Sequence, residues 1–262
     1  MAGRLSEARA QLTAEVKGAP SDGSKRTLLF QVLAFLGEWE KAERHLDMIV
    51  ALNPPSETGV QVYKNLITAE RERQGVIERK SIPGFAASPP AYLDAYFAAW
   101  DRLNDGEPAK ARRLYREIGG HLSPLSGTLD GRSFEGFSDM DAFLSLFLEV
   151  IVHDRYLWVP FESIGELSIS PPKSLFDLLW VPARLVTWEG LSMQCYLPVL
   201  YPGSAAVDDD KVKLGRITDW LPLGGSFYRG IGQHMFQAGK EEIPLLEMRE
   251  VVFSLKNRKE DE

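Results

Sequence analysis

A repeat of 34 residues in the first half of the chain restricts the possible fold more than any other feature of the sequence. The landmarks are Gly3, Ala8, Leu12 and Pro20 in the first copy, Gly37, Ala42, Leu46 and Pro54 in the second, and Gly106 and Ala111 in the third. The third copy begins 69 residues beyond the second, close to two periods, and the unit between them is degenerate. A phased period of this length is typical of stacked helical repeats.

Each landmark has a physical role in a helical hairpin. Gly37 ends one helix in a tight turn, where a residue without a Cβ is unstrained at positive φ. Ala42 allows two helices to approach closely, and Pro54 stops the second helix. The pattern predicts tetratricopeptide-like hairpins, which bury their apolar faces by stacking and present a groove suited to a peptide or helix.

The second half of the chain changes to strand-like patterns rich in aromatic and β-branched residues. We expect strands at residues 156–161, 165–170, 183–188, 192–200 and 245–255. Residues 188–190 read as a hairpin turn, and Cys195 as a small core residue on a strand face. Two capping patterns predict helices, one at 142–151 and a short one at 178–180 closed by Pro182. The predicted fold is α+β, with a helical repeat domain at 1–125 and a mainly antiparallel β-rich domain at 126–262.

Charge and cysteine content exclude several functional classes. The net charge is −7, divided between 17 basic and 16 acidic residues in 1–125 (net +1) and 13 basic and 21 acidic residues in 126–262 (net −8). A chain with this negative net charge lacks the excess of basic residues that binding to a nucleic-acid backbone requires. A single cysteine rules out an intramolecular disulfide and a thiolate metal cluster. Neither a secretory signal nor an apolar run long enough for a bilayer is present, so we expect a cytoplasmic protein with no membrane contact.

No catalytic motif is recognisable, and the sequence predicts no cofactor and no metal. The glycine-rich segment 223–232 could cradle an anion, but without a strand-then-helix context it reads as a turn-rich loop. An alternative hypothesis is an enzyme or small-ligand receptor in the second half. Its candidate buried ion-pair network consists of Asp177, Arg184, Glu189, Arg216 and Asp219.

Several segments of this chain resemble the ImpE family, also called the TagJ or SciE-type family. They are residues 156–161, 172–183, 197–204, 214–220 and 230–233 in the second half, and 26–31, 37–42 and 69–73 in the first. The resemblance covers essentially the whole chain. Two departures are visible: residues 137–141 are less acidic than the family's aspartate cluster, and His234 stands where a basic arginine is expected. The second departure weakens the case for a charged pocket at His234.

The resemblance implies a non-enzymatic accessory protein of bacterial type VI secretion, cytoplasmic, with helical repeats before a β-rich domain. It further implies that the protein binds the N-terminal helix of the small contractile-sheath subunit. Together with the sheath-disassembly ATPase, it would assist the handling of the sheath. The repeat groove is one candidate surface for that helix. The second half offers the other, because Trp and Arg are frequent hot-spot residues. The residues we select there are Trp180, Arg184, Arg216, Asp219, Trp220 and Arg229.

Overall fold

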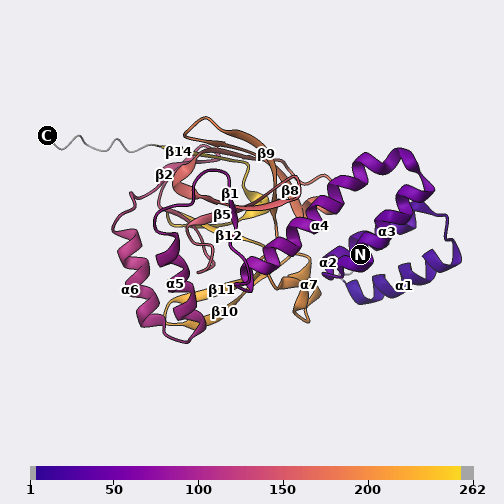
Figure 1. Cartoon of the computed structure of the whole chain (residues 1–262), viewed down its shortest axis with the longest axis horizontal. Coiled ribbons are helices and arrows are strands. Elements are labelled where there is room, and N and C mark those ends of the chain that lie inside the picture. The colour runs from indigo at the N-terminus through magenta and orange to yellow at the C-terminus, as the bar shows by residue number, and fades with distance from the viewer. Residues whose placement is uncertain (1–3, 255–262) are drawn as a thin grey trace.

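The computed structural model describes residues 4–254, in which a mainly helical part precedes a β-rich part (Figure 1). The helices of the first part are α1 (Leu5–Gly18), α2 (Gly23–Phe35), α3 (Trp39–Leu52), α4 (Glu57–Ile77), α5 (Leu93–Asn104) and α6 (Pro108–Gly119). Strands follow from Ser126 onward, so the predicted α+β class is confirmed. Gly3, the first landmark of the repeat, and Leu255, the last residue of a predicted strand, lie outside the described residues.

The second and third copies of the repeat form helical hairpins through the same local device. Gly37 follows α2 with φ +67°, and Gly106 follows α5 with φ +71°. The amide after Gly37 donates to the Leu33 carbonyl, and the amide after Gly106 to the Arg102 carbonyl, which closes both helix ends. Ala42 and Ala111 are fully buried in the helices that follow. The spacing in the sequence therefore reflects two copies of one turn-and-packing arrangement.

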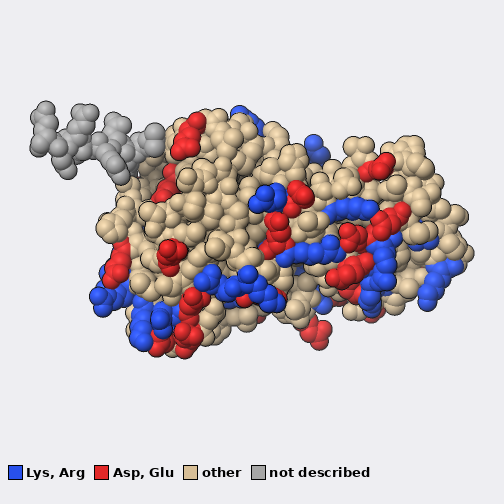
Figure 2. Space-filling model, in the orientation of Figure 1, with Lys and Arg blue, Asp and Glu red and all other residues tan. Residues whose placement is uncertain are grey.

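These hairpins do not form one continuous stack. Helices α1 to α3 lie at one end of the molecule, α4 runs from them to the sheet, and α5 with α6 packs at the opposite end (Figure 1). Helix α4 contacts strand β6 (Arg155–Pro160), and α5 contacts β10 (Thr218–Gly224). The helix stacking expected from the repeats is therefore confined to α1–α4. Over the helical end, acidic and basic side chains are closely interspersed (Figure 2).

The main sheet has nine strands in the order β1-β6-β5-β9-β8-β7-β14-β2-β3. Neighbouring strands run antiparallel except for the pair β1–β6. The strands not yet bounded are β1 (Gly84–Phe85), β2 (Ser126–Leu129), β3 (Arg132–Glu135), β5 (Phe147–Val152), β7 (Ile164–Ile169), β8 (Trp180–Thr187), β9 (Ser192–Pro198) and β14 (Glu250–Ser254). Four of the five predicted strands match β6 to β9, and the fifth matches β14 in part. The turn at 188–190 joins β8 to β9 as predicted.

Two smaller sheets complete the β-rich part. One contains β4 (Phe137–Asp139), β12 (Met235–Ala238) and β13 (Glu241–Pro244), and the other pairs β10 with β11 (Phe227–Gly232). The glycine-rich segment 223–232, predicted to be a turn-rich loop, is instead mostly this β10–β11 hairpin. Gly224 and Gly225 provide its turn, both at positive φ. The short helix α7 (Asp210–Lys213) precedes the hairpin.

The helix predicted at 142–151 is wrong, and the short helix predicted at 178–180 lies two residues earlier, as a single 3-10 turn at Phe176–Leu178. Residues 142–146 form turns and β5 follows, so the apolar run 142–151 is not a helix. Strand β5 lies between β6 and β9 and is buried almost throughout, which removes the alternation that would have identified a strand. Pro182 lies inside β8 rather than closing a helix. Its carbonyl accepts from the Ser170 amide just past the end of β7, where a missing N–H is tolerated.

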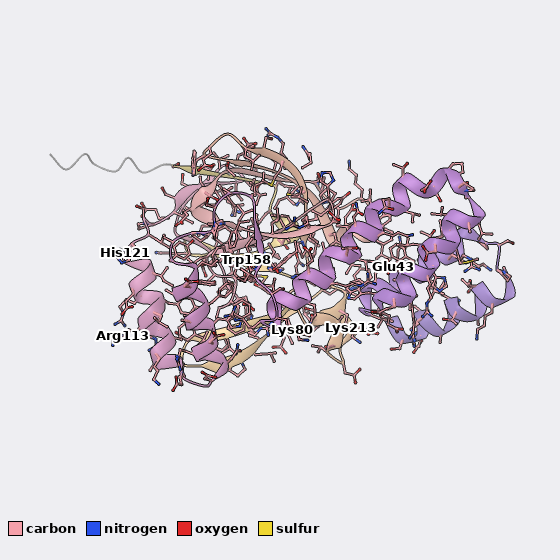
Figure 3. All side chains as sticks on the ribbon, viewed as in Figure 1. Glu43, Lys80, Arg113, His121, Trp158 and Lys213 are labelled. Carbon is pink, nitrogen blue, oxygen red and sulfur yellow. The ribbon has the colours of Figure 1, made fainter. Side chains whose placement is uncertain are left out.

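An aromatic cluster joins α5 to the main sheet. The Trp100 ring stacks on Trp158 with centroids 5.9 Å apart and on Phe143 at 4.3 Å. Trp158 lies near the middle of the molecule (Figure 3) and is fully buried. Buried residues of both parts belong to one hydrophobic cluster, which includes Cys195 as predicted. Among residues 4–254, no helix combines the length and apolarity needed to cross a bilayer.

Candidate functional site

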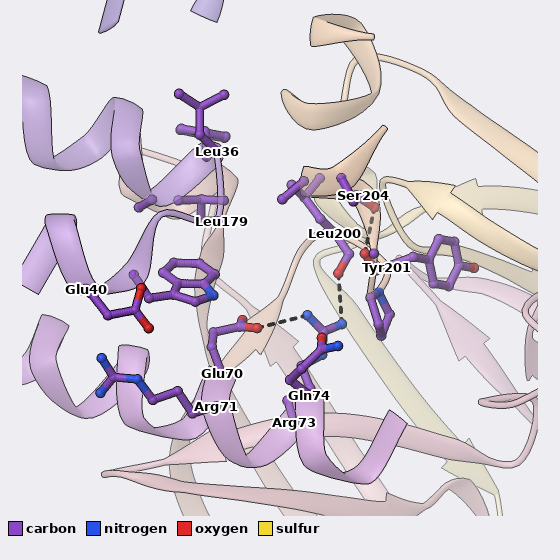
Figure 4. Close-up of a pocket in the computed structure, with 18 residues that line it drawn as sticks. Leu36, Glu40, Glu70, Arg71, Arg73, Gln74, Leu179, Leu200, Tyr201 and Ser204 are labelled. Atoms are coloured by element: carbon purple, nitrogen blue, oxygen red, sulfur yellow. Dashed lines mark hydrogen bonds and ion pairs between the residues drawn. The ribbon is translucent and has the colours of Figure 1, made fainter. Parts of the chain in front are cut away.

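A cleft of about 520 Å³ lies where the helical part meets the β-rich part. It is lined by residues from segments 34–40, 70–74 and 200–206 and by Leu179 (Figure 4). The first segment is the α2–α3 turn, the second belongs to α4, and the third follows β9. Both parts of the chain are therefore needed to form this cleft.

The α2–α3 turn forms one wall of the cleft because Gly37 permits both its conformation and its packing. At φ +67° the backbone is in the left-handed region, and a Cβ placed on Gly37 would lie 3.1 Å from the Cβ of Ala205. The absence of a side chain therefore lets the hairpin approach the segment after β9. Leu36, Trp39, Leu179 and Leu200 add apolar lining. Leu179 lies beside Leu36, and Leu200 lies on the other side of the cleft (Figure 4).

The floor of the cleft contains a buried ion pair. Arg73 on α4 donates from Nε to Oε1 of Glu149 at 2.9 Å and from Nη2 to Oε2 of Glu149 at 2.6 Å. Its Nη2 also donates to the Leu200 carbonyl at 2.8 Å, and Glu70 lies 3.4 Å from Nη1. Glu149 is on β5, so this bidentate contact ties α4 directly to the main sheet.

His234 adds a second buried cation next to Arg73, although it does not itself line the cleft. Its Nδ1 lies 2.7 Å from Oδ2 of Asp139, and its Nε2 lies 3.0 Å from Oε2 of Glu149. Burial by itself would lower the pKa of His234, but the two carboxylates outweigh burial and raise the pKa to about 9. The imidazole is therefore protonated at neutral pH. The positive charge that the family pattern assigns to an arginine is retained here by histidine.

The shared carboxylate of Glu149 is held in its charged form. Burial by itself would raise the pKa of Glu149, but the charges and hydrogen bonds of Arg73 and His234 keep that pKa well below its usual range. Tyr156 donates its hydroxyl to Glu149, and Trp158 donates from Nε1 to the same tyrosine oxygen at 2.6 Å. Such a carboxylate does not exchange protons near neutral pH, so its role is to hold the surrounding elements together.

Tyr201 extends this network to the sheet formed by β4, β12 and β13. Its hydroxyl donates to Oδ1 of Asp139 at 2.7 Å and accepts from the Met235 amide at 3.0 Å. The Tyr201 ring packs on the His234 ring with centroids 4.0 Å apart. The polar atoms of these side chains are thus used within the protein. The network places α4, β5, β4 and β12 in a fixed arrangement beneath the cleft.

The charged groups nearer the mouth of the cleft belong to α3 and α4. Glu70 accepts a hydrogen bond from Nε1 of Trp180 at 2.8 Å, and the Trp39 ring lies 6.0 Å from the Trp180 ring. Glu40 and Arg71 are exposed at the opening (Figure 4). Apolar walls with charges of both signs at the rim suit an amphipathic partner.

The six residues selected from the sequence do not form one surface. Trp180 is buried beside the cleft, whereas Arg184 is exposed and pairs with Glu166 at 3.3 Å. Arg216 and Asp219 are exposed on the approach to β10 and on β10 itself. The two remaining residues, Trp220 and Arg229, lie on the β10–β11 hairpin, where Trp220 packs near Tyr201 and Arg229 lies over the Phe143 ring.

Arg229 helps to set the charge of a buried carboxyl. Burial and then the charge of Asp139 raise the pKa of Asp141 to about 7, against the opposing charge of Arg229. The main-chain amides of Phe143 and Gly230 donate to Asp141. Arg229 therefore has a role inside the fold as well as at the surface.

The buried network predicted from the sequence is wrong in its membership. Asp177 accepts from the amides of Lys173 and Ser174 in a local turn, and Glu189 is exposed at the β8–β9 turn. The actual network joins residues from both halves of the chain. Glu149 was noticeable in the sequence only as a charge inside an apolar run, and His234 only as a departure from the family pattern. Within residues 4–254, no group of three His, Cys, Asp or Glu side chains is arranged to hold a metal ion.

Comparison with known proteins relates this architecture to one family. Residues 131–252 match the family model described as ImpE protein. The chain is 31% identical over 252 residues to the type VI secretion system accessory component TagJ of Pseudomonas aeruginosa, an alignment that covers 96% of this chain and 88% of that protein. A crystal structure of a Vibrio parahaemolyticus protein superposes with a TM-score of 0.83 at 22% identity, covering 96% of this chain and 94% of that one. The last likeness shows a shared fold.

Proposed function

The chain belongs to the ImpE family of type VI secretion accessory proteins, and from this membership we propose that it acts as a non-enzymatic adaptor. The identity of 31% over 96% of the chain carries the proposal, because it includes both parts that form the cleft. The family assignment concerns the whole molecule rather than one segment. An alignment that covers 96% of the chain is consistent with a function located where the two parts meet.

The proposed partner is the N-terminal helix of the small contractile-sheath subunit, bound in the cytoplasm during sheath assembly or recycling together with the sheath-disassembly ATPase. The cleft supports this choice through its chemistry. Leu36, Trp39 and Leu200 offer apolar surface, while Glu40 and Arg71 offer both signs of charge at the rim. An amphipathic helix presents the same combination, with an apolar stripe flanked by charged side chains.

Binding without catalysis is supported by the state of the charged floor. Glu149 is shared by Arg73 and His234, and Asp139 is shared by His234 and Tyr201. A general acid or base must be able to reach a substrate and to change its protonation state near the working pH. These carboxylates are enclosed by permanent partners instead. We therefore assign the network to holding the walls of the cleft in position.

Calorimetry with a synthetic peptide of the sheath-subunit N-terminal helix tests the proposal. Ala206 is exposed at the cleft, so Ala206→Trp places an indole at the opening without entering the hydrophobic core. We expect this variant to weaken binding by about tenfold or more, which corresponds to about 1.4 kcal/mol. Ala109→Trp, at an exposed position on α6, is the matched control and should bind like the unaltered protein.

Two results would contradict the proposal. The absence of binding to the unaltered protein at about 100 µM peptide would reject the sheath helix as partner. Equal binding by the Ala206 and Ala109 variants would reject the cleft as its site. Circular dichroism of both variants establishes that any difference arises at the cleft and not from loss of the fold.

A further inference from the structure

A second pocket, of about 480 Å³, lies between α1 and α3 above α2 and shares no lining residue with the cleft. We call it the basic pocket because of the side chains that surround it. They are Arg9, Thr13, Val16 and Lys17 from α1, Arg26, Leu29 and Leu33 from α2, and Lys41, Arg44, His45 and Met48 from α3. Five of these are Lys or Arg and none is Asp or Glu. The nearly neutral helical part thus contains a locally positive cavity.

Internal ion pairs neutralise only part of this charge. Glu38 lies at the edge and contacts both Arg9 and Lys41. In the described part of the chain, Lys17, Arg26 and Arg44 have no carboxylate within 4.0 Å of their charged nitrogens. Three cations therefore converge on the pocket without a counter-charge from the protein.

Arg26 is the most informative of these cations because it is 92% buried, with 8% of its surface exposed. Its Nε donates to the Pro20 carbonyl at 2.8 Å, its one side-chain hydrogen bond within residues 4–254. Buried guanidinium groups are normally paired with carboxylates, as Arg73 is with Glu149 in this same protein. In contrast to Arg73, Arg26 is a buried cation without a carboxylate partner among the described residues.

His45 provides a second unmet polar group in the pocket. Its Nδ1 is buried and has no hydrogen-bond partner among the described residues. Burial, followed by the charges of Arg26 and Arg44, lowers the pKa of His45. The other charged groups that line the pocket, Lys17, Arg9 and Lys41, are also basic, and Glu38 at the edge pairs with the last two. An anion bound here would offset these charges and favour protonation of the imidazole.

Apart from Thr13, the remaining lining is apolar, which favours a peptide over a simple inorganic anion as the occupant. Val16, Leu29 and Leu33 are buried, and Met48 stands at the rim with 42% of its surface exposed. Methionine is common at surfaces that adapt to peptide partners. A ligand that fits must present carboxylates and apolar side chains on neighbouring positions.

We propose that the basic pocket binds an acidic amphipathic segment of a partner protein, whose Asp or Glu side chains pair with Arg26 and Arg44. Its apolar side chains pack on Leu29, Leu33 and Met48. This site is separate from the cleft assigned to the sheath helix. The chain therefore carries two docking surfaces of different chemistry that share no lining residue.

Fluorescence anisotropy with a labelled synthetic peptide tests this proposal. The probe carries Glu on one helical face and Leu on the other, and its reference peptide has every Glu replaced by Gln. We expect the acidic peptide to bind at least about tenfold more tightly than the reference, and its affinity to fall as salt rises. Arg44→Gln should weaken binding by about tenfold. Arg116→Gln on α6, an exposed arginine without an ion pair among the described residues, is the charge-matched control.

Because Arg26→Gln removes a buried group and so puts the fold of α2 at risk, the exposed Lys17→Gln serves as the second variant. The imidazole resonances of His45 provide an independent readout, since the pKa of His45 should rise when the acidic peptide binds. Equal affinity for the two peptides, or no effect of Arg44→Gln and Lys17→Gln together, would overturn the proposal. Inorganic phosphate competing at the affinity of the peptide would reassign the pocket to small anions. Ala206→Trp should leave binding of the acidic peptide unchanged. Failure of the basic-pocket proposal can therefore be distinguished from failure of the cleft proposal.

Discussion

Arg73 on α4 and Glu149 on β5 form a bidentate ion pair at 2.9 and 2.6 Å in the interior of the protein. The two residues are 76 positions apart and belong to the two parts of the chain. Arg73 lines the cleft, and Glu149 and His234 contact Arg73 from the interior of the protein. The stability of this pair and the integrity of the cleft should therefore change together.

Replacing Arg73 by methionine should lower the free energy of unfolding by about 3 to 5 kcal/mol, because it leaves the buried Glu149 carboxylate without its main partner. Urea denaturation followed by circular dichroism measures the change. The control is Arg113→Met, which removes an exposed pair with Glu117 at 3.0 Å on α6. That change should cost less than about 0.5 kcal/mol. Similar losses in the two variants would show that the buried pair contributes no more to the free energy of unfolding than the exposed pair.

Stability should decrease between about pH 6.5 and pH 9 because of His234. The folded pKa of about 9 lies above the ordinary value of 6.5, so the folded protein binds the proton more tightly than the unfolded chain. The resulting stabilisation is fully present below pH 6.5 and is lost as pH rises through 9, by on the order of 3 kcal/mol. Denaturation series at several pH values measure it. His234→Gln should flatten the dependence, and an unchanged slope would contradict the assignment.

Gly37→Ala should destabilise the protein by about 1 to 2 kcal/mol, because φ is +67° and the new methyl group would meet Ala205. The matched control is Gly59→Ala. Gly59 lies in α4 with open space around its Cα, so alanine there should stabilise the helix by about 0.5 to 1 kcal/mol. Thermal unfolding of both variants provides the comparison. Opposite signs are expected, and equal signs would show that the turn does not depend on glycine.

A fragment of residues 1–125, the predicted repeat domain, should fail to fold completely by itself. Trp100 on α5 is 1% exposed in the whole chain, and its ring contacts come largely from Phe143 and Trp158. Truncation exposes this face to water, so the fragment should bind a hydrophobic dye and lose near-ultraviolet circular dichroism. A cooperative thermal transition without dye binding would instead establish 1–125 as an independent domain.

Local features of the chain are the ones that sequence reasoning predicted well. The turn at Gly37 and the buried contact at Ala42 depend on residues within one or two helical turns, so their spacing alone identifies the hairpin. Strands β6 to β9 were predicted because alternation and turn residues are also local signals. The helix predicted at 142–151 failed for the complementary reason: β5 is covered on both sides, and a run that is apolar throughout does not distinguish strand from helix.

The cleft and its charged floor follow from long-range packing instead. Arg73, Glu149 and His234 belong to α4, β5 and the segment before β12, and neither their spacing nor their residue types distinguish them from surface charges. Burial decides their role, because a charge enclosed in the protein must find partners whereas an exposed one is satisfied by water. The same test separates Arg26 from Arg44, two arginines of the basic pocket that look alike in the sequence. Which charges are enclosed depends on how sheet and helices assemble, and only the tertiary structure contains that information.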